Sequence, residues 1–190
     1  VLSPVAPHNL TMRPVKPDPG IHVQTVRIPT ENGGVSALLL SPLTAPKNAA
    51  GILWLHGGGY IAGMKEMVHA SRAIDLVKKF GVAVLSPGYR LALKAPYPAA
   101  IDDCYAALLY LKAHAAAFGV RSDQLMVGGE SAGVPAELDV YHSDMHAFDM
   151  MRPDDVLSIQ AAEAFNTRFA DAQARFFTPQ HEIQEERHDP

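Results

Sequence analysis

The chain has 190 residues, of which 48% are hydrophobic and 19% are charged, with 16 basic against 20 acidic side chains. This composition predicts one globular domain over residues 1–190, with no basic surface for a nucleic acid and no apolar run long enough to span a membrane. Cys104 is the only cysteine, which rules out an intrachain disulfide and favours a reducing compartment, and hence a cytoplasmic location.

The first part of the chain predicts an irregular lead-in followed by a hairpin. Residues 1–20 are rich in proline and are expected to be irregular or to retain part of a substrate-covering cap. Alternating side chains predict a strand over Ile21–Ile28. The "ENGG" turn at 31–34 then leads into a second strand over Val35–Ser41.

Strands and helices alternate in the rest of the predicted fold. Helical spacing covers residues 65–80 and an alanine-rich stretch covers 98–118. Three short apolar runs, as expected of strands buried on both faces of a sheet, precede, separate and follow these two stretches: Gly51–Leu55, Val82–Ser86 and Gln124–Val127. This alternation predicts an α/β domain with a largely parallel sheet.

Two glycine-rich turns follow predicted strands. One is "HGGGY" at 56–60, and the other is the G-x-S-x-G pattern at 129–133, with Ser131 at its centre. Alone, the first can be a flexible turn or part of a phosphate loop, although no Lys-Ser or Lys-Thr pair follows it. The second can be a tight turn with an exposed serine. Together, in this order at strand ends, they indicate a nucleophilic serine and a loop of amides facing it.

Five ordered segments carry a family resemblance. They resemble the hormone-sensitive-lipase-like branch of the α/β-hydrolase superfamily, whose members are mostly carboxylesterases: "WLHGGGY", "LSPGYRLA" at 85–92, "YPAAIDDCYAALLYL" at 97–111, "VGGESAG", and "GVPAELDVYHSDMHAFD" at 133–149. The resemblance implies an α/β-hydrolase-type three-layer sandwich with a mostly parallel sheet.

The resemblance also implies a reaction and its residues. Ser131 is the implied nucleophile and His146 the implied general base. The implied oxyanion hole consists of the Gly58, Gly59 and Ala132 amides, with Gly57 supporting the turn. The implied activity is hydrolysis of small carboxylic esters through an acyl-enzyme, without a metal or organic cofactor. The alternative is a catalytically inactive hydrolase-fold remnant that acts as a binding module, and either form is compatible with a homo-oligomer.

The acid of the implied triad is not assigned. The family order is serine, acid, histidine, and none of the acidic residues around His146 fits the role: Glu137, Asp139, Asp144 and Asp149. His142 and His146 flank Asp144 and could mimic a metal pair, but they follow a predicted strand instead of lying on a helix.

The chain departs from the family after the serine. Relatives place a helix, further strand–helix units, part of a cap and the acid-bearing strand there, and none of these fits between Gly133 and Val134. The fold is therefore expected to be incomplete. A parallel strand over 136–141 would need a crossover of roughly a dozen residues, whereas an antiparallel one carries His146 about 20 Å from Ser131.

Three explanations for this departure stay open. The sequence can omit a segment between residues 133 and 134, the protein can carry a real deletion, or two copies can complete their sites by exchanging segments.

Other residues have structural interpretations. His56 is expected to be a hydrogen-bonding scaffold for the glycine loop. Arg90 is expected to be a buried or semi-buried anchor for Asp102 and Asp103, and Cys104 to lie in the core.

Overall fold

A computed structural model of the chain describes residues 16–130 and 152–176. The chain divides into two compact units, Val1–Pro135 and Ala136–Pro190, and each is described by itself. The expectation of one domain over residues 1–190 stays a prediction.

The first unit contains a five-stranded sheet of order β1-β2-β4-β3-β5. Its strands are β1 (Ile21–Ile28), β2 (Val35–Pro42), β3 (Ala49–Leu55), β4 (Ala83–Pro87) and β5 (Val120–Gly129). β3 pairs in parallel with β4 and β5, whereas β2 is antiparallel to both β1 and β4. Every described strand except β2 therefore runs in one direction, as the prediction of a largely parallel sheet requires.

The β1–β2 hairpin forms where the sequence predicts it. Ile28 lies opposite Val35, and the Gly33 amide donates to the Thr30 carbonyl at 3.2 Å. Gly33 and Gly34 have φ angles of 97° and 95°, a region that side-chain-bearing residues rarely adopt. The two glycines therefore account for the tight turn.

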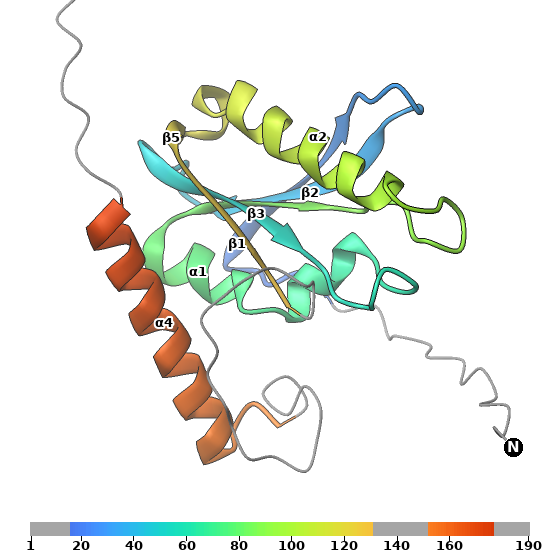
Figure 1. Cartoon of the computed structure of the whole chain (residues 1–190). Coiled ribbons are helices and arrows are strands. Elements are labelled where there is room, and N and C mark those ends of the chain that lie inside the picture. Colours follow the sequence, from blue (N-terminus) through green and yellow to red (C-terminus); the bar gives the residue numbers. More distant parts are fainter. Residues whose placement is uncertain (1–15, 131–151, 177–190) are drawn as a thin grey trace, which may run out of the picture. The chain divides into compact units, whose positions relative to one another are not determined.

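Helices cover both faces of the sheet. Figure 1 shows α2 (Ala99–Ala113) on one face and α1 (Ala73–Phe80) on the other. The predicted helix over 65–80 is interrupted, since a 3₁₀ turn, η1 (Lys65–Ala70), precedes α1. The Ser71 hydroxyl donates to the Val68 carbonyl and accepts from the Ala73 amide, which ends the first turn and caps the next.

The second predicted helix is also shorter than expected. The stretch 98–118 forms α2 and then the separate 3₁₀ turn η2 (Ala116–Phe118), which ends at Gly119 with a φ of 68°. Together, the sheet and the helices on its two faces give the three layers that the resemblance implies.

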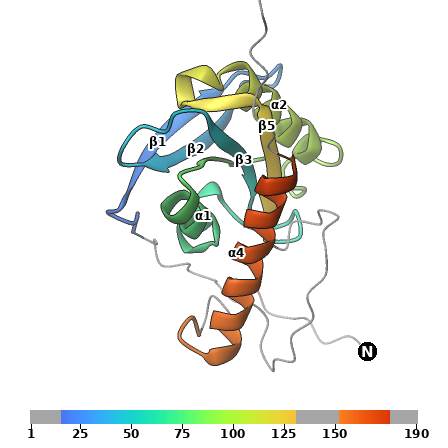
Figure 2. The ribbon, with the colours of Figure 1, turned by 90° about the vertical axis from the view of Figure 1, so that its left-hand side faces the viewer.

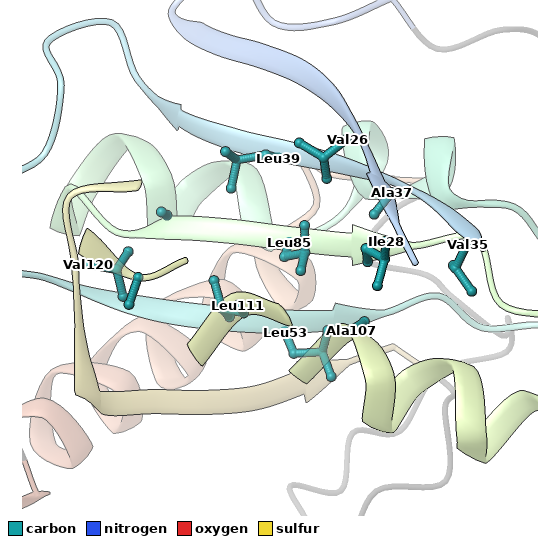
Figure 3. Close-up of a cluster of buried hydrophobic side chains, with 12 residues drawn as sticks. Val26, Ile28, Val35, Ala37, Leu39, Leu53, Leu85, Ala107, Leu111 and Val120 are labelled. Carbon is teal, nitrogen blue, oxygen red and sulfur yellow. The ribbon is translucent and has the colours of Figure 1, made fainter. Parts of the chain in front are cut away.

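A cluster of buried apolar side chains fills the space between the sheet and α2 (Figure 3). Ala107 and Leu111, one turn apart on α2, pack onto apolar side chains that come from all five strands. The strand residues are Val26, Ile28, Val35, Ala37, Leu39, Leu53, Ala83, Leu85 and Val120.

The prediction that the third apolar run is a strand buried on both faces is wrong. β5 extends from Val120 to Gly129, and the Val127 side chain is 45% exposed. Within the described residues β5 pairs with β3 only, so it lies at an edge of the sheet. An apolar run indicates a strand but cannot distinguish a central strand from an edge strand.

The second unit contains α4 (Val156–Phe176), which the sequence interpretation does not predict. The turn that starts it is closed by the Asp155 amide, which donates to the Arg152 carbonyl at 3.1 Å. None of the helices in the described ranges combines the length and the apolar character that crossing a membrane requires.

Candidate active site

The sheet register brings the start of the glycine loop beside the end of β5. β3, β4 and β5 are parallel, so their carboxyl ends lie at the same edge of the sheet. Leu55 at the end of β3 lies opposite Gly129 at the end of β5, and the Glu130 amide donates to the Leu55 carbonyl at 3.3 Å. The loop from His56 therefore starts beside the residue that precedes Ser131.

Several predicted site residues lie outside the described residues. These are Ser131, Ala132 and His146, together with the alternatives His142, Glu137, Asp139, Asp144 and Asp149. Their roles stay predictions. The described part of the site consists of the glycine loop, Glu130 and the side chains packed around them.

The glycine loop has a backbone that only glycine tolerates at one position. Gly58 has a φ of 116°, and a Cβ there would overlap the Ala62 carbonyl. The Gly58 carbonyl accepts hydrogen bonds from the amides of Ile61 and Ala62, both at 3.1 Å. The chain thus folds back tightly around Gly58.

This fold leaves backbone donors available. Gly58 and Gly59 are exposed, and their amides donate no hydrogen bond to any other residue in 16–130 or 152–176. Free N–H groups at a strand end are what an oxyanion hole needs. Gly57, in contrast, is buried, and its carbonyl contacts the His56 ring.

His56 braces this loop from within. Its side chain is 2% exposed, and its Nδ1 lies 2.9 Å from the Gly57 carbonyl, to which it donates. The ring stacks on Tyr89 with centroids 4.1 Å apart, and the Tyr89 hydroxyl donates to the His56 carbonyl at 2.6 Å. Burial lowers the pKa of His56, so the imidazole is neutral at physiological pH. These contacts agree with the scaffold role that the sequence predicts.

Glu130 makes a long-range contact that the sequence interpretation missed. Its carboxylate accepts a hydrogen bond at 2.9 Å from the amide of Arg72, the residue at the start of α1. A negative charge at a helix N-terminus is favourable. The segment leading into Ser131 is thus attached to β3 through its backbone and to α1 through its carboxylate. The two partners lie 58 positions apart, and no local sequence signal links them.

A second anchor follows β4. The Arg90 backbone amide and Nε both donate to Asp103 Oδ2 at 2.9 Å, and an Nη atom of Arg90 donates to Oδ1 at 2.8 Å. The Asp103 side chain is 1% exposed, whereas Asp102 is exposed. The predicted Arg90 anchor is therefore correct for Asp103 and wrong for Asp102, which points to solvent from the next position on the helix.

An apolar cavity of about 160 Å³ opens beside the glycine loop. It is lined by Leu55, Tyr60, Tyr89, Ala100, Ile101 and Cys104. Cys104 is half-buried, so the expected core position is only partly correct. Burial raises the pKa of its thiol to about 12, and a protonated thiol is a poor nucleophile. The cavity therefore offers packing surface and no reactive group of its own.

Comparisons with known proteins identify a family and individual proteins that this chain resembles. The family described as alpha/beta hydrolase fold matches residues 52–140. Over 116 residues the chain is 33% identical to an acetyl esterase of Salmonella paratyphi A, an alignment that covers 60% of this chain and 35% of the esterase. Over 96 residues it is 32% identical to hormone-sensitive lipase of Bos taurus, covering 50% and 13%.

Solved structures agree with these sequence matches. A bacterial heroin esterase has a TM-score of 0.56 and 31% identity, covering 60% of this chain and 37% of the esterase. These matches confirm the resemblance and the fold that the sequence predicts. The chain spans little more than a third of the length of these esterases.

Proposed function

Because residues 52–140 of this chain belong to the α/β-hydrolase fold family, we propose that the protein is a serine hydrolase that cleaves small carboxylic esters through an acyl-enzyme. The observation that carries this proposal is the pairing of Leu55 with Gly129. It supports the proposal because the loop that carries the exposed Gly58 and Gly59 amides starts beside the residues that precede Ser131.

The chemistry uses backbone donors and two side chains. Where the two side chains meet, the Ser131 hydroxyl attacks the ester carbonyl while His146 takes its proton, and the proton then passes to the departing alcohol. The Gly58, Gly59 and Ala132 amides stabilise the oxyanion, where a single donor is worth about 10²–10³ in kcat. Water, deprotonated by His146, then releases the acid and restores Ser131. Neither a metal nor an organic cofactor takes part.

The position of His146 limits this reaction. With Gly133 joined directly to Val134, the hydrolase topology keeps Ser131 and His146 of one copy apart. We therefore propose that a single continuous chain is a weak esterase, in which the amides supply most of the remaining rate enhancement.

The cavity indicates the class of ester. Its volume of about 160 Å³ and its lining of apolar and aromatic side chains suit a short acyl or alkyl group. The similarity to an enzyme named acetyl esterase supports short-chain esters as substrates. A cytoplasmic location, expected from the single cysteine, completes the proposal.

Turnover of p-nitrophenyl acetate by the chain and by Ser131→Ala tests this function. We expect measurable hydrolysis by the unchanged chain, with loss of the enzymatic part in the variant. Labelling by a fluorophosphonate should likewise require Ser131. Equal rates and no labelling would instead favour the inactive binding module.

A further inference from the structure

The turn that follows β4 contacts the glycine loop at both of its ends. β3 and β4 pair in parallel, so this turn starts at the same edge of the sheet as the loop after β3. The two segments then lead to α2 and α1, on opposite faces of the sheet (Figure 2). The Tyr89 hydroxyl donates to the His56 carbonyl at 2.6 Å, and the Ala92 amide donates to the Tyr60 carbonyl at 2.7 Å. The first and the last residue of "HGGGY" are therefore both held by the turn after β4.

Tyr89 is itself fixed by its neighbours in the chain. The Gly88 amide donates to the Ser36 carbonyl on β2 at 2.9 Å, and the Arg90 amide donates to Asp103 Oδ2 on α2 at 2.9 Å. Tyr89 is 5% exposed. Burial raises the pKa of its hydroxyl to about 12, so the hydroxyl keeps its proton and remains a donor. Tyr89 can therefore hold the glycine loop in a fixed position relative to β2 and α2.

Tyr89 holds His56 at two points. Its ring stacks on the imidazole with centroids 4.1 Å apart and planes 6° apart, and its hydroxyl binds the backbone carbonyl of the same residue. The imidazole Nδ1 in turn donates to the Gly57 carbonyl at 2.9 Å. The orientation of the Gly57 carbonyl therefore depends on His56 and, through it, on Tyr89.

The Gly57 carbonyl sets the direction of the Gly58 N–H. Both groups belong to one planar, trans peptide unit, in which the carbonyl and the N–H point in opposite directions. The hydrogen bond from the His56 ring to the Gly57 carbonyl therefore also restrains the Gly58 amide, a donor of the proposed oxyanion hole. The next peptide unit, which carries the Gly59 N–H, is restrained as well, because the Gly58 carbonyl accepts two backbone amides.

We propose that Tyr89 is a positioning residue that orients the Gly58 amide toward the oxyanion, acting through the ring and the carbonyl of His56. The proposal rests on the proposed function, since an oxyanion forms only if the protein hydrolyses esters. A misplaced donor binds the negative charge of the transition state less well, whereas the uncharged ester in the ground state depends on that donor much less. Loss of the Tyr89 hydroxyl should therefore lower kcat and leave KM nearly unchanged.

Tyr89→Phe removes the hydroxyl and retains the ring that stacks on His56. We expect kcat for p-nitrophenyl acetate to fall about tenfold, with KM changed by less than about twofold. Tyr105→Phe is the matched control, because Tyr105 is 60% exposed on α2, and it should leave both constants unchanged. In a Gly58→Ala background, where the donor is already displaced, Tyr89→Phe should lower kcat by less than about twofold. A full further tenfold loss in the double variant would overturn the proposal.

Nuclear magnetic resonance tests the same link without turnover. The ¹H–¹⁵N resonance of the Gly58 amide should shift in Tyr89→Phe and stay in place in Tyr105→Phe. A chain without Ser131-dependent hydrolysis would refute the proposed function, while a shifted Gly58 resonance would still support positioning by Tyr89. An unmoved Gly58 resonance in folded Tyr89→Phe would overturn the positioning role whatever the esterase activity. So would a lower urea midpoint with unchanged kcat, which is the result that a purely structural tyrosine predicts.

Discussion

Glu130 shows how one side chain can set the geometry of a strand end. Its carboxylate accepts the Arg72 amide at 2.9 Å while its own amide bonds to the Leu55 carbonyl. Helix α1 and the end of β3 therefore restrain the residue that directly precedes the proposed nucleophile. Restraining a nucleophile in its reactive position lowers the barrier to attack, so Glu130 is expected to act through Ser131 without touching substrate.

Glu130→Ala should lower the free energy of unfolding by about 1 kcal/mol, because the Arg72 amide loses its charged acceptor. The same variant should lower kcat more than KM changes. Glu130→Gln keeps an acceptor and should recover part of both effects. Urea unfolding and steady-state kinetics measure them, with Glu31→Ala, an exposed turn residue, as the control. Equal effects of Glu31→Ala and Glu130→Ala would contradict the assignment.

Substitutions at Gly58 and Gly59 distinguish a requirement for the backbone geometry of the loop from a requirement for its flexibility. A Cβ at Gly58 would overlap the Ala62 carbonyl, whereas one at Gly59 meets nothing within 4 Å. Gly58→Ala should therefore displace the loop amides and reduce esterase kcat by about 10²-fold, the loss expected for one oxyanion donor. Gly59→Ala, with a φ of 59°, should cost about 1 kcal/mol of stability and much less activity. Similar kcat values for the two variants would refute a role for the loop geometry.

His56 makes stability depend on pH. Burial lowers its pKa below the ordinary value of 6.5, so the unfolded chain binds a proton there at a higher pH than the folded chain does. The free energy of unfolding is therefore full above about pH 6.5 and falls as the pH drops from there toward the folded pKa. His69, whose pKa burial also lowers, adds to the same slope.

Urea unfolding at several pH values between about 5.5 and 7.5 measures this slope. His56→Gln should flatten it relative to the unchanged chain. An unaltered slope in His56→Gln would show that burial of this imidazole is not its source.

At the scale of elements, the Arg90–Asp103 pair joins the end of β4 to α2. Asp103 is buried while the Arg90 side chain is 33% exposed. Asp103→Ala leaves the guanidinium and the Arg90 amide without their acceptor, and should cost about 2–3 kcal/mol of stability. Asp102→Ala, one position away and exposed, should change it by less than about 1 kcal/mol. Thermal and urea unfolding measure both, and equal losses would contradict an anchoring role for Asp103.

Sequence patterns predict elements well where local chemistry decides them. Ile21–Ile28 alternates, and the glycines of "ENGG" permit the turn, so the hairpin is readable from the chain alone. The break at Ser71 is harder to predict, because its hydroxyl bonds compete with a helical pattern that continues across it. α4 lacks glycine and proline throughout, which is a helical signal, but it lies beyond the segments that carry the family motifs.

The features of the site that the sequence does not predict depend on contacts between residues that are far apart in the chain. The glycine motifs predict that loop 56–60 meets the end of β5, and the pairing of Leu55 with Gly129 agrees with this. Nothing in either motif predicts that Glu130 would contact Arg72, since packing of α1 decides that contact. Likewise, the exposure of Val127 follows from which strands are present beside β5, and this is a property of the whole sheet.

For the molecule as a whole, the decisive question is whether Ser131 and His146 meet. His146 follows Ser131 by 15 positions, and both lie outside the described residues. The described end of β5 lies at the same sheet edge as the glycine loop. A following antiparallel strand of six residues would carry the histidine about 20 Å from that edge, whereas a Ser–His hydrogen bond needs about 3 Å.

In a chain with Gly133 joined to Val134, the two side chains should therefore act independently. Ser131→Ala should abolish the enzymatic hydrolysis of p-nitrophenyl acetate, while His146→Ala should reduce it by less than about tenfold. In an assembled triad, loss of the histidine costs about 10⁶ in kcat. The tryptic peptide from Ser122 to Arg168 contains the junction, so its mass verifies continuity in the same preparation.

A large loss of activity in His146→Ala that mixing with Ser131→Ala restores would indicate sites completed between two copies. A large loss without such restoration, in a chain of verified continuity, would show that a single copy brings the pair together and that the topology argument is wrong.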